Sequence, residues 1–135
     1  LVHINLKKYN ILLDDMTKIM LADDSPPFLQ TLKRFLVAEE FEVVGEATNG
    51  YDAVEKYKES NPDLLLMDVL MPKMSGLAAL KEIIEHDPNA KVIMMSALDR
   101  TDLKEEALKV GVKHFLFKPF QMDELLVTIE KVLNQ

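Results

Sequence analysis

From residue 18 onward, apolar residues follow two alternating patterns along the chain. The first is a short, nearly continuous apolar run, which is typical of a strand that is covered on both faces. Such runs lie at Ile19–Ala22, Val43–Ala47, Leu64–Asp68, Val92–Ser96 and Phe115–Phe117. The second pattern, found after each run, repeats apolar residues at the spacing of an amphipathic helix. The sets that share a helix face are Phe28, Leu32, Phe35 and Leu36; Val54 and Tyr57; Leu77, Leu80, Ile83 and Ile84; Leu103, Ala107 and Val110; and Leu125, Leu126, Ile129, Val132 and Leu133. The patterns predict five strand–helix units in strict alternation.

Residues that favour helix ends stand where these units require them. Ser25 precedes two prolines, and a serine cap followed by proline is common in a first helical turn. Asn49 and Ser75 precede the second and third helical patterns, and both residue types are good N-caps. Gly111 follows the fourth pattern, where a glycine commonly ends a helix. The boundaries therefore support the same alternation.

Strict alternation of strands and helices predicts the α/β fold class. Short connections and right-handed crossovers favour a parallel sheet with helices on both faces, that is, a doubly wound (βα)5 domain. A closed eight-stranded barrel needs about 250 residues, so a chain of 135 residues predicts an open sheet. In open sheets of this kind the site lies beyond the carboxyl ends of the strands.

Composition narrows the class further. A hydrophobic fraction of 48% over 135 residues is enough for one sizeable core. A net charge of −7 argues against a free-standing nucleic-acid-binding protein. The chain has no cysteine, which excludes a disulfide framework and fits a cytoplasmic protein. No apolar run approaches the about 20 residues that span a bilayer, so no membrane association is expected.

Residues 1–15 stand apart from the alternating strand and helix patterns of the rest of the sequence, and Met16 is a natural start for the domain. They lack the pattern of a signal peptide. We expect an upstream or cloning-derived extension, with an accessory helix as the alternative, and a single domain over residues 16–135.

The predicted carboxyl ends of the strands carry the polar residues. Asp23 and Asp24 follow the first run, Asp68 ends the third, Ser96 ends the fourth, and Lys118 follows the fifth. Three carboxylates in one cleft repel one another, and a single lysine does not balance them. A divalent cation with oxygen ligands would, and Mg²⁺ suits carboxylates together with a backbone carbonyl near Asp68. Cation, ammonium and hydroxyl together describe a receptacle for a phosphoryl group.

The residue types that are missing from this rim restrict the chemistry. His3, His86 and His114 lie outside it, and the first strand is followed by acids in place of a glycine-rich phosphate loop. The available nucleophile is a carboxylate, and its attack on phosphorus gives an aspartyl phosphate, for which Asp68 is the best candidate. The methionines near the rim are interpreted as packing residues and not as a metal site.

Four motifs together resemble the receiver domains of two-component response regulators. They are "IMLADDS", "LLLMDVLMPKMSG", "VIMMSA" and "HFLFKPF", in that order and with the family's spacing, and the match covers residues 16–135. The stretch from "VVGEATNG" to "MPKMSG" is most similar to stand-alone, CheY-like chemotaxis regulators. The resemblance implies a flavodoxin-like fold with strand order 2-1-3-4-5.

The resemblance also implies roles for the rim residues. Asp68 is expected to accept a phosphoryl group from a phosphohistidine of a sensor histidine kinase. Asp24, Asp23, Asp68 and the backbone carbonyl of Leu70 are expected to hold Mg²⁺, with Mn²⁺ as a possible substitute. Lys118 is expected to neutralise the phosphoryl oxygens, and its bond to the following proline is expected to be cis. The protein would be no conventional enzyme, with at most self-phosphorylation from small donors and autodephosphorylation.

The same resemblance implies a switch. Ser96 would bond a phosphoryl oxygen, and Phe115 would turn inward when Ser96 moves. The readout would be the face built from the fourth helix, the fifth strand and the fifth helix. It would contact a downstream protein or an attached output domain, which in chemotaxis would be a flagellar switch or a similar target. The expected oligomeric state is a monomer or a dimer linked to phosphorylation.

Three positions depart from the common family pattern. Leu70, two residues after Asp68, and Leu98, two residues after Ser96, are apolar where their side chains would flank the path of the hydrolytic water. We therefore expect a comparatively long-lived phosphoryl group. Phe115 stands where the family often has tyrosine, so a partner contact through a hydroxyl is not available.

Three alternatives remain beside a stand-alone regulator. The chain also fits a receiver cut from a DNA-binding transcriptional regulator. An aspartate-nucleophile phosphatase commonly carries a second aspartate where this chain has Leu70, which cannot transfer a proton. A flavodoxin-like electron carrier needs a Gly/Ser/Thr-rich loop where this chain has Asp23 and Asp24.

Overall fold

The structure is a computed structural model that describes residues 16–135. The predicted extension, residues 1–15, lies outside the described residues. The five strands are β1 (Lys18–Ala22), β2 (Glu42–Ala47), β3 (Leu64–Asp68), β4 (Val92–Ser96) and β5 (His114–Phe117). The five helices are α1 (Pro26–Ala38), α2 (Gly50–Ser60), α3 (Gly76–His86), α4 (Thr101–Val110) and α5 (Met122–Leu133). The predicted alternation is confirmed, and three strands begin one residue earlier than the apolar runs.

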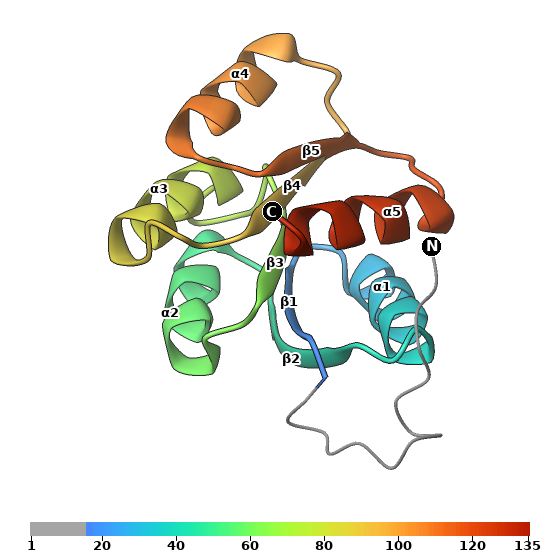
Figure 1. Cartoon of the computed structure of the whole chain (residues 1–135). Coiled ribbons are helices and arrows are strands. Elements are labelled where there is room, and N and C mark those ends of the chain that lie inside the picture. Colours follow the sequence, from blue (N-terminus) through green and yellow to red (C-terminus); the bar gives the residue numbers. More distant parts are fainter. Residues whose placement is uncertain (1–15) are drawn as a thin grey trace.

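The strands form one parallel sheet in the order β2-β1-β3-β4-β5, with helices on both faces (Figure 1). This is the predicted doubly wound, flavodoxin-like order. Every residue of the neighbouring strands β3 and β4 is buried. That burial explains why their sequences are continuous apolar runs and not alternating ones.

Two hydrophobic clusters, one on each face of the sheet, form the core. The α1-side cluster joins α1 and α5 to the sheet, with Leu32, Leu36, Ile129 and Val132 among its fully buried members. The α2-side cluster joins α2, α3 and α4 to the other face. It contains Met67, Met71 and Met94, with Met74 packed against it, and Met95 belongs to the α1-side cluster, so the interpretation of these rim methionines as packing residues is confirmed. None of the helices within residues 16–135 combines the length and apolar character that a membrane crossing requires.

The predicted helix ends are confirmed by their hydrogen bonds. Ser25, Asn49 and Ser75 each accept a hydrogen bond from a backbone N–H in the first turn of the helix that follows. Gly111 has a φ of 128°, and its N–H donates to the carbonyl of Ala107. These bonds fix where α1, α2 and α3 begin and where α4 ends, while the parallel strands bring the rim residues to one edge of the sheet.

The predicted apolar face of α1 is partly wrong. The buried residues of this helix are Leu29, Leu32 and Leu36, whereas Phe28 and Phe35 are only partly buried at the edge of the cluster. Leu29, Leu32 and Leu36 repeat every three or four residues, and this row of leucines faces the sheet. The larger rings lie beside that row.

Candidate functional site

The carboxyl ends of β1 and β3 bring three carboxylates together. Asp23, Asp24 and Asp68 each offer one oxygen, and these oxygens all lie within 4.8 Å of one another. Asp23 is fully buried, Asp68 is 8% exposed, and Asp24 is exposed to solvent. The acidic rim predicted from the sequence is therefore assembled as expected, with one carboxylate at its base and one at its mouth.

The ammonium group of Lys118 lies among these acids. Its Nζ donates a hydrogen bond of 2.6 Å to Oδ2 of Asp23 and lies 3.5 Å from Oδ2 of Asp68. The side chain is 19% exposed, so both ion pairs are largely screened from water. The Lys118–Pro119 bond is cis, as expected. The N–H of Lys118 donates to the carbonyl of Ser96, which ties the loop after β5 to the end of β4.

Backbone hydrogen bonds hold the acids in place. The N–H of Asp23 donates to the carbonyl of Ala47, and Oδ1 of Asp23 accepts from the N–H of Ser25 at 2.9 Å. The N–H of Val69, directly after Asp68, donates to the carbonyl of Met95 on β4. Both acids are therefore fixed by neighbouring strands or turns, and little movement of their main chain is available.

Glycine is required where the helix after β3 returns to the site. The N–H of Gly76 donates to the carbonyl of Val69 at 2.7 Å. A Cβ atom at position 76 would lie 2.9 Å from the carbonyl carbon of Asp68 and closer still to its oxygen. Only a residue without a side chain permits this approach.

Burial raises the pKa of Asp68 above the usual value of a carboxyl group. The Lys118 ammonium acts in the opposite direction, and the charges of Asp23 and Asp24 add to the rise. Three carboxylates beside one ammonium also leave the cluster with an excess of negative charge. Three carboxylates on a rigid frame are the hard oxygen donors that Mg²⁺ prefers, so the residues present fit this ion.

Ser96 lies at the carboxyl end of β4, the strand that pairs with the end of β3, and Phe115 lies on the neighbouring strand β5. Ser96 follows Met95, which is the register partner of Asp68, and it is buried. Its Oγ accepts a hydrogen bond from the N–H of Leu98 at 3.0 Å. Phe115 is buried in the α2-side cluster, next to Met94 in the register. The two predicted switch residues are thus close in the sheet, and the serine hydroxyl is engaged within its own loop.

The leucines that depart from the family pattern differ in exposure. The side chain of Leu70 is 50% exposed on the loop after β3, and Leu98 is partly buried. The use of the Leu70 carbonyl as a metal ligand stays a prediction.

One neighbour of the site was not predicted from the sequence. Phe28, which was predicted to lie on the apolar face of the first helix, has its ring centroid 4.2 Å from Nζ of Lys118. The available signal was its place one residue before Leu29, off the row of buried leucines. That offset turns the ring towards the rim.

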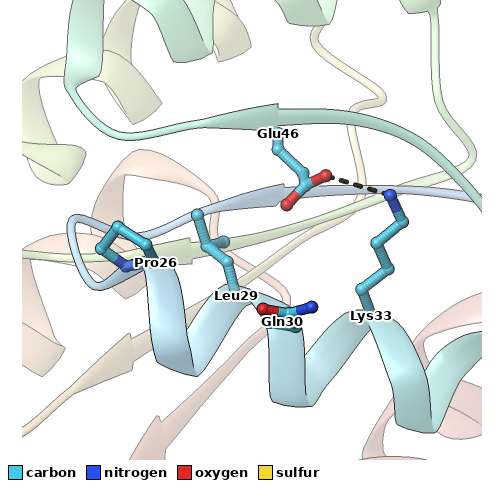
Figure 2. A pocket seen from close by; sticks show the side chains of 5 residues that line it. All are labelled: Pro26, Leu29, Gln30, Lys33 and Glu46. Atoms are coloured by element: carbon cyan, nitrogen blue, oxygen red, sulfur yellow. Dashed lines mark hydrogen bonds and ion pairs between the residues drawn. The ribbon is translucent and has the colours of Figure 1, made fainter.

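A shallow pocket of about 230 Å³ lies away from this cluster. It is formed between α1 and the end of β2 and is lined by Pro26, Leu29, Gln30, Lys33 and Glu46 (Figure 2). An exposed ion pair of 3.4 Å between Lys33 and Glu46 crosses it. It contains none of the rim residues, so the candidate site is the acidic cluster.

Comparisons with known proteins agree with this geometry. Residues 19–130 match the family described as the response regulator receiver domain. The chain is 47% identical over 117 residues to the chemotaxis protein CheY of Bacillus subtilis, covering 87% of this chain and 98% of the relative. It is 44% identical over 115 residues to CheY of Thermotoga maritima, covering 85% and 96%. A crystal structure of a CheX–CheY–BeF3–Mg²⁺ complex from Borrelia burgdorferi is similar with a TM-score of 0.84 and 33% identity, covering 96% of this chain and 95% of that one.

Proposed function

Because the chain belongs to the family of response regulator receiver domains, we propose that it is a phosphorylation-activated signalling switch whose phosphoacceptor is Asp68. The observation that carries the proposal is the Lys118 ammonium, which lies 2.6 Å from Asp23 and 3.5 Å from Asp68 at the carboxyl end of the sheet. An electropositive group fixed beside a buried carboxylate is suited to a phosphoryl group on that carboxylate. CheY-like receivers are signalling switches, and here the phosphoryl group comes from a sensor histidine kinase.

The chemistry at Asp68 is a phosphoryl transfer. A carboxylate oxygen forms a bond to phosphorus while the bond from phosphorus to the histidine nitrogen of the kinase breaks, and the imidazole leaves with the bonding electron pair. Lys118 neutralises charge on the phosphoryl oxygens. Asp23, Asp24, Asp68 and the carbonyl of Leu70 would hold Mg²⁺, and the bound ion would supply further positive charge to those oxygens. The similar crystal structure from Borrelia burgdorferi is of a CheX–CheY complex that contains both Mg²⁺ and BeF3.

The signal passes through Ser96. Its Oγ accepts from the Leu98 N–H at 3.0 Å, so its own proton is available to donate to a new phosphoryl oxygen. Movement of this loop leaves room beside β5, which Phe115 takes up as it turns further inward. The equilibrium between two arrangements of α4, β5 and α5 then shifts, and the partner binds one arrangement more tightly than the other. The partner is a downstream protein in the cytoplasm, and a chemotactic target is the candidate that the CheY relatives favour.

The proposal is tested by mass spectrometry of the intact protein after incubation with Mg²⁺ and a small acyl phosphate. We expect one added phosphoryl mass, which is absent in Asp68→Ala and absent when EDTA removes the metal. Asp123→Asn, which changes an exposed aspartate on α5, is the matched control and should keep the added mass. An added mass that persists in Asp68→Ala would overturn the assignment. If the wild type gains no mass, a titration with beryllofluoride and Mg²⁺ decides, since failure to bind this phosphoryl analogue would reject the proposal.

A further inference from the structure

The ring of Phe28 lies against the ammonium group that the site depends on. Nζ of Lys118 is 4.2 Å from the centroid of this ring, well within the about 6 Å at which a ring face attracts a cation. The same nitrogen contacts the carboxylates of Asp23 and Asp68. The ammonium therefore has neighbours from three separate segments, namely α1 and the ends of β1 and β3.

The ring is itself held in place. Its centroid is 6.1 Å from that of Phe120, with an angle of 75° between the ring planes, which is the favourable edge-to-face arrangement. Phe120 is two residues after Lys118, just beyond the cis peptide bond. The ring of Phe28 thus contacts both the ammonium of Lys118 and the ring of Phe120, which lies in the same segment as Lys118 between β5 and α5.

The turn that places this ring also holds one of the acids. The N–H of Phe28 donates to Oγ of Ser25 at 3.4 Å, and the N–H of Ser25 donates to Oδ1 of Asp23 at 2.9 Å. The ring and the carboxylate are therefore positioned by one short stretch of chain, and both contact the ammonium of Lys118. A change in the ring acts on the ammonium without altering either ion-pair partner.

A ring face attracts the ammonium without occupying one of its N–H donors, which a further carboxylate would do. A lysine side chain is long and flexible, with three N–H donors at its end. A carboxylate neighbour uses a donor, whereas a ring face attracts the charge without a lone pair that competes for a phosphoryl oxygen. Contact with the ring restricts the range of positions that Nζ of Lys118 can take, and it leaves N–H donors free for the phosphoryl oxygens.

We propose that Phe28 is a positioning residue that holds the Lys118 ammonium beside Asp68 and so strengthens the binding of the phosphoryl group. This inference rests on the proposed function, because it assumes that a phosphoryl group forms on Asp68. Phe28 does not itself touch the reacting atoms, so its effect reaches them through Lys118.

The test is a titration of the full chain with beryllofluoride and Mg²⁺, followed by fluorine NMR. We expect Phe28→Leu to weaken beryllofluoride binding about fivefold, the factor that corresponds to a cation–π contact at a partly exposed ammonium. Phe28→Tyr keeps the ring face and should retain most of the affinity. Phe35→Leu removes a partly buried ring from the same helix, on the edge of the α1-side cluster, and should bind as the wild type does.

A second measurement needs neither metal nor phosphoryl analogue. In the metal-free protein, the ring current of Phe28 should shift the ε-methylene resonance of Lys118 upfield of the other lysines. The shift should vanish in Phe28→Leu and persist in Phe28→Tyr and Phe35→Leu. A residue that only fills space would change the free energy of unfolding without this pattern.

The outcomes separate the two proposals. If the wild type does not bind beryllofluoride, the proposed function fails. If the wild type binds it and Phe28→Leu binds equally well, only the role of Phe28 is rejected. If Phe28→Leu is unfolded by circular dichroism, Phe28→Met takes its place, and affinity equal to that of the wild type again rejects the role.

Discussion

Gly76 provides the sharpest test of how the fold supports the site. Alanine at this position would place a Cβ atom 2.9 Å from the carbonyl carbon of Asp68 and 3.1 Å from Cε of Met94. The methionine end can move, but the carbonyl of Asp68 belongs to the central strand β3. The next residue, Val69, donates its N–H to β4 at 2.9 Å, so the strand cannot retreat without losing sheet hydrogen bonds.

The expected cost follows from this geometry. Overpacking a well-packed core costs about 1–3 kcal/mol, and the upper end applies because the obstructing atoms are backbone. Alanine recovers up to about 1 kcal/mol through its higher helix propensity. We expect Gly76→Ala to lower the free energy of unfolding by about 2 kcal/mol. With an m-value of about 2 kcal/mol/M in urea, the midpoint of unfolding should fall by about 1 M.

Gly45→Ala is the matched control for the urea measurement. A Cβ atom on Gly45 would lie 3.6 Å from Cγ of Met20, an ordinary contact, and the residue does not have a positive φ. This variant should be unchanged or more stable by about 0.5 kcal/mol, because alanine reduces the entropy of the unfolded chain. Gly76→Ala should also gain less phosphoryl mass than Gly45→Ala, since the main chain of Asp68 is displaced. The reasoning is refuted if Gly76→Ala unfolds at the same urea concentration as Gly45→Ala, or at a higher one.

Three further predictions concern other parts of the molecule. Tyr57→Phe removes the hydrogen bond of 2.9 Å from the buried Tyr57 hydroxyl to Asp87, and should lower the free energy of unfolding by about 1 kcal/mol in urea; an unchanged midpoint would contradict this. Burial, reinforced by two nearby lysine ammonium groups, lowers the pKa of His114, so its neutral form favours the folded state. This contribution to the free energy of unfolding is fully present above pH 6.5, the pKa of the unfolded state, and is lost as the pH falls below that value. His114→Gln should therefore lose less stability than the wild type between about pH 7.5 and about pH 5.5. Parallel plots of unfolding free energy against pH for the two proteins would argue against this. On the proposal that the Leu70 side chain flanks the path of the hydrolytic water, Leu70→Asn should release the phosphoryl group several-fold faster, because a polar side chain replaces an apolar one. Equal decay rates in a mass-spectrometric time course would reject that reasoning.

Local patterns were enough to predict the order of elements and the rim. Continuous apolar runs identified the strands because β3 and β4 are covered on both faces, and the capping residues marked the starts of α1, α2 and α3. Since parallel strands point the same way, the residues that end them must meet at one edge. Strand direction alone therefore predicts that the three acids, Ser96 and Lys118 lie together.

The differences among those residues required the tertiary structure. Asp23 and Asp24 are adjacent and chemically identical, yet Asp23 is fully buried and Asp24 is exposed. The sequence pattern cannot separate them, because the cover over Asp23 comes from distant segments. Its hydrogen bonds with Ala47 and Lys118 show this, the latter spanning 95 positions along the chain.

The amino-acid sequence by itself determined the alternating fold, the edge of the sheet that carries the chemistry and the residue types available there, because periodicity and strand direction are local properties of the chain. Only the tertiary structure decided that Lys118 pairs with both Asp23 and Asp68, that Gly76 must lack a side chain, and that the ring of Phe28, at the edge of the α1-side cluster, also contacts the ammonium. These features arise where α1, β3 and the segment after β5 meet. Contacts between segments so far apart in the sequence depend on packing, which hydrophobic periodicity does not encode.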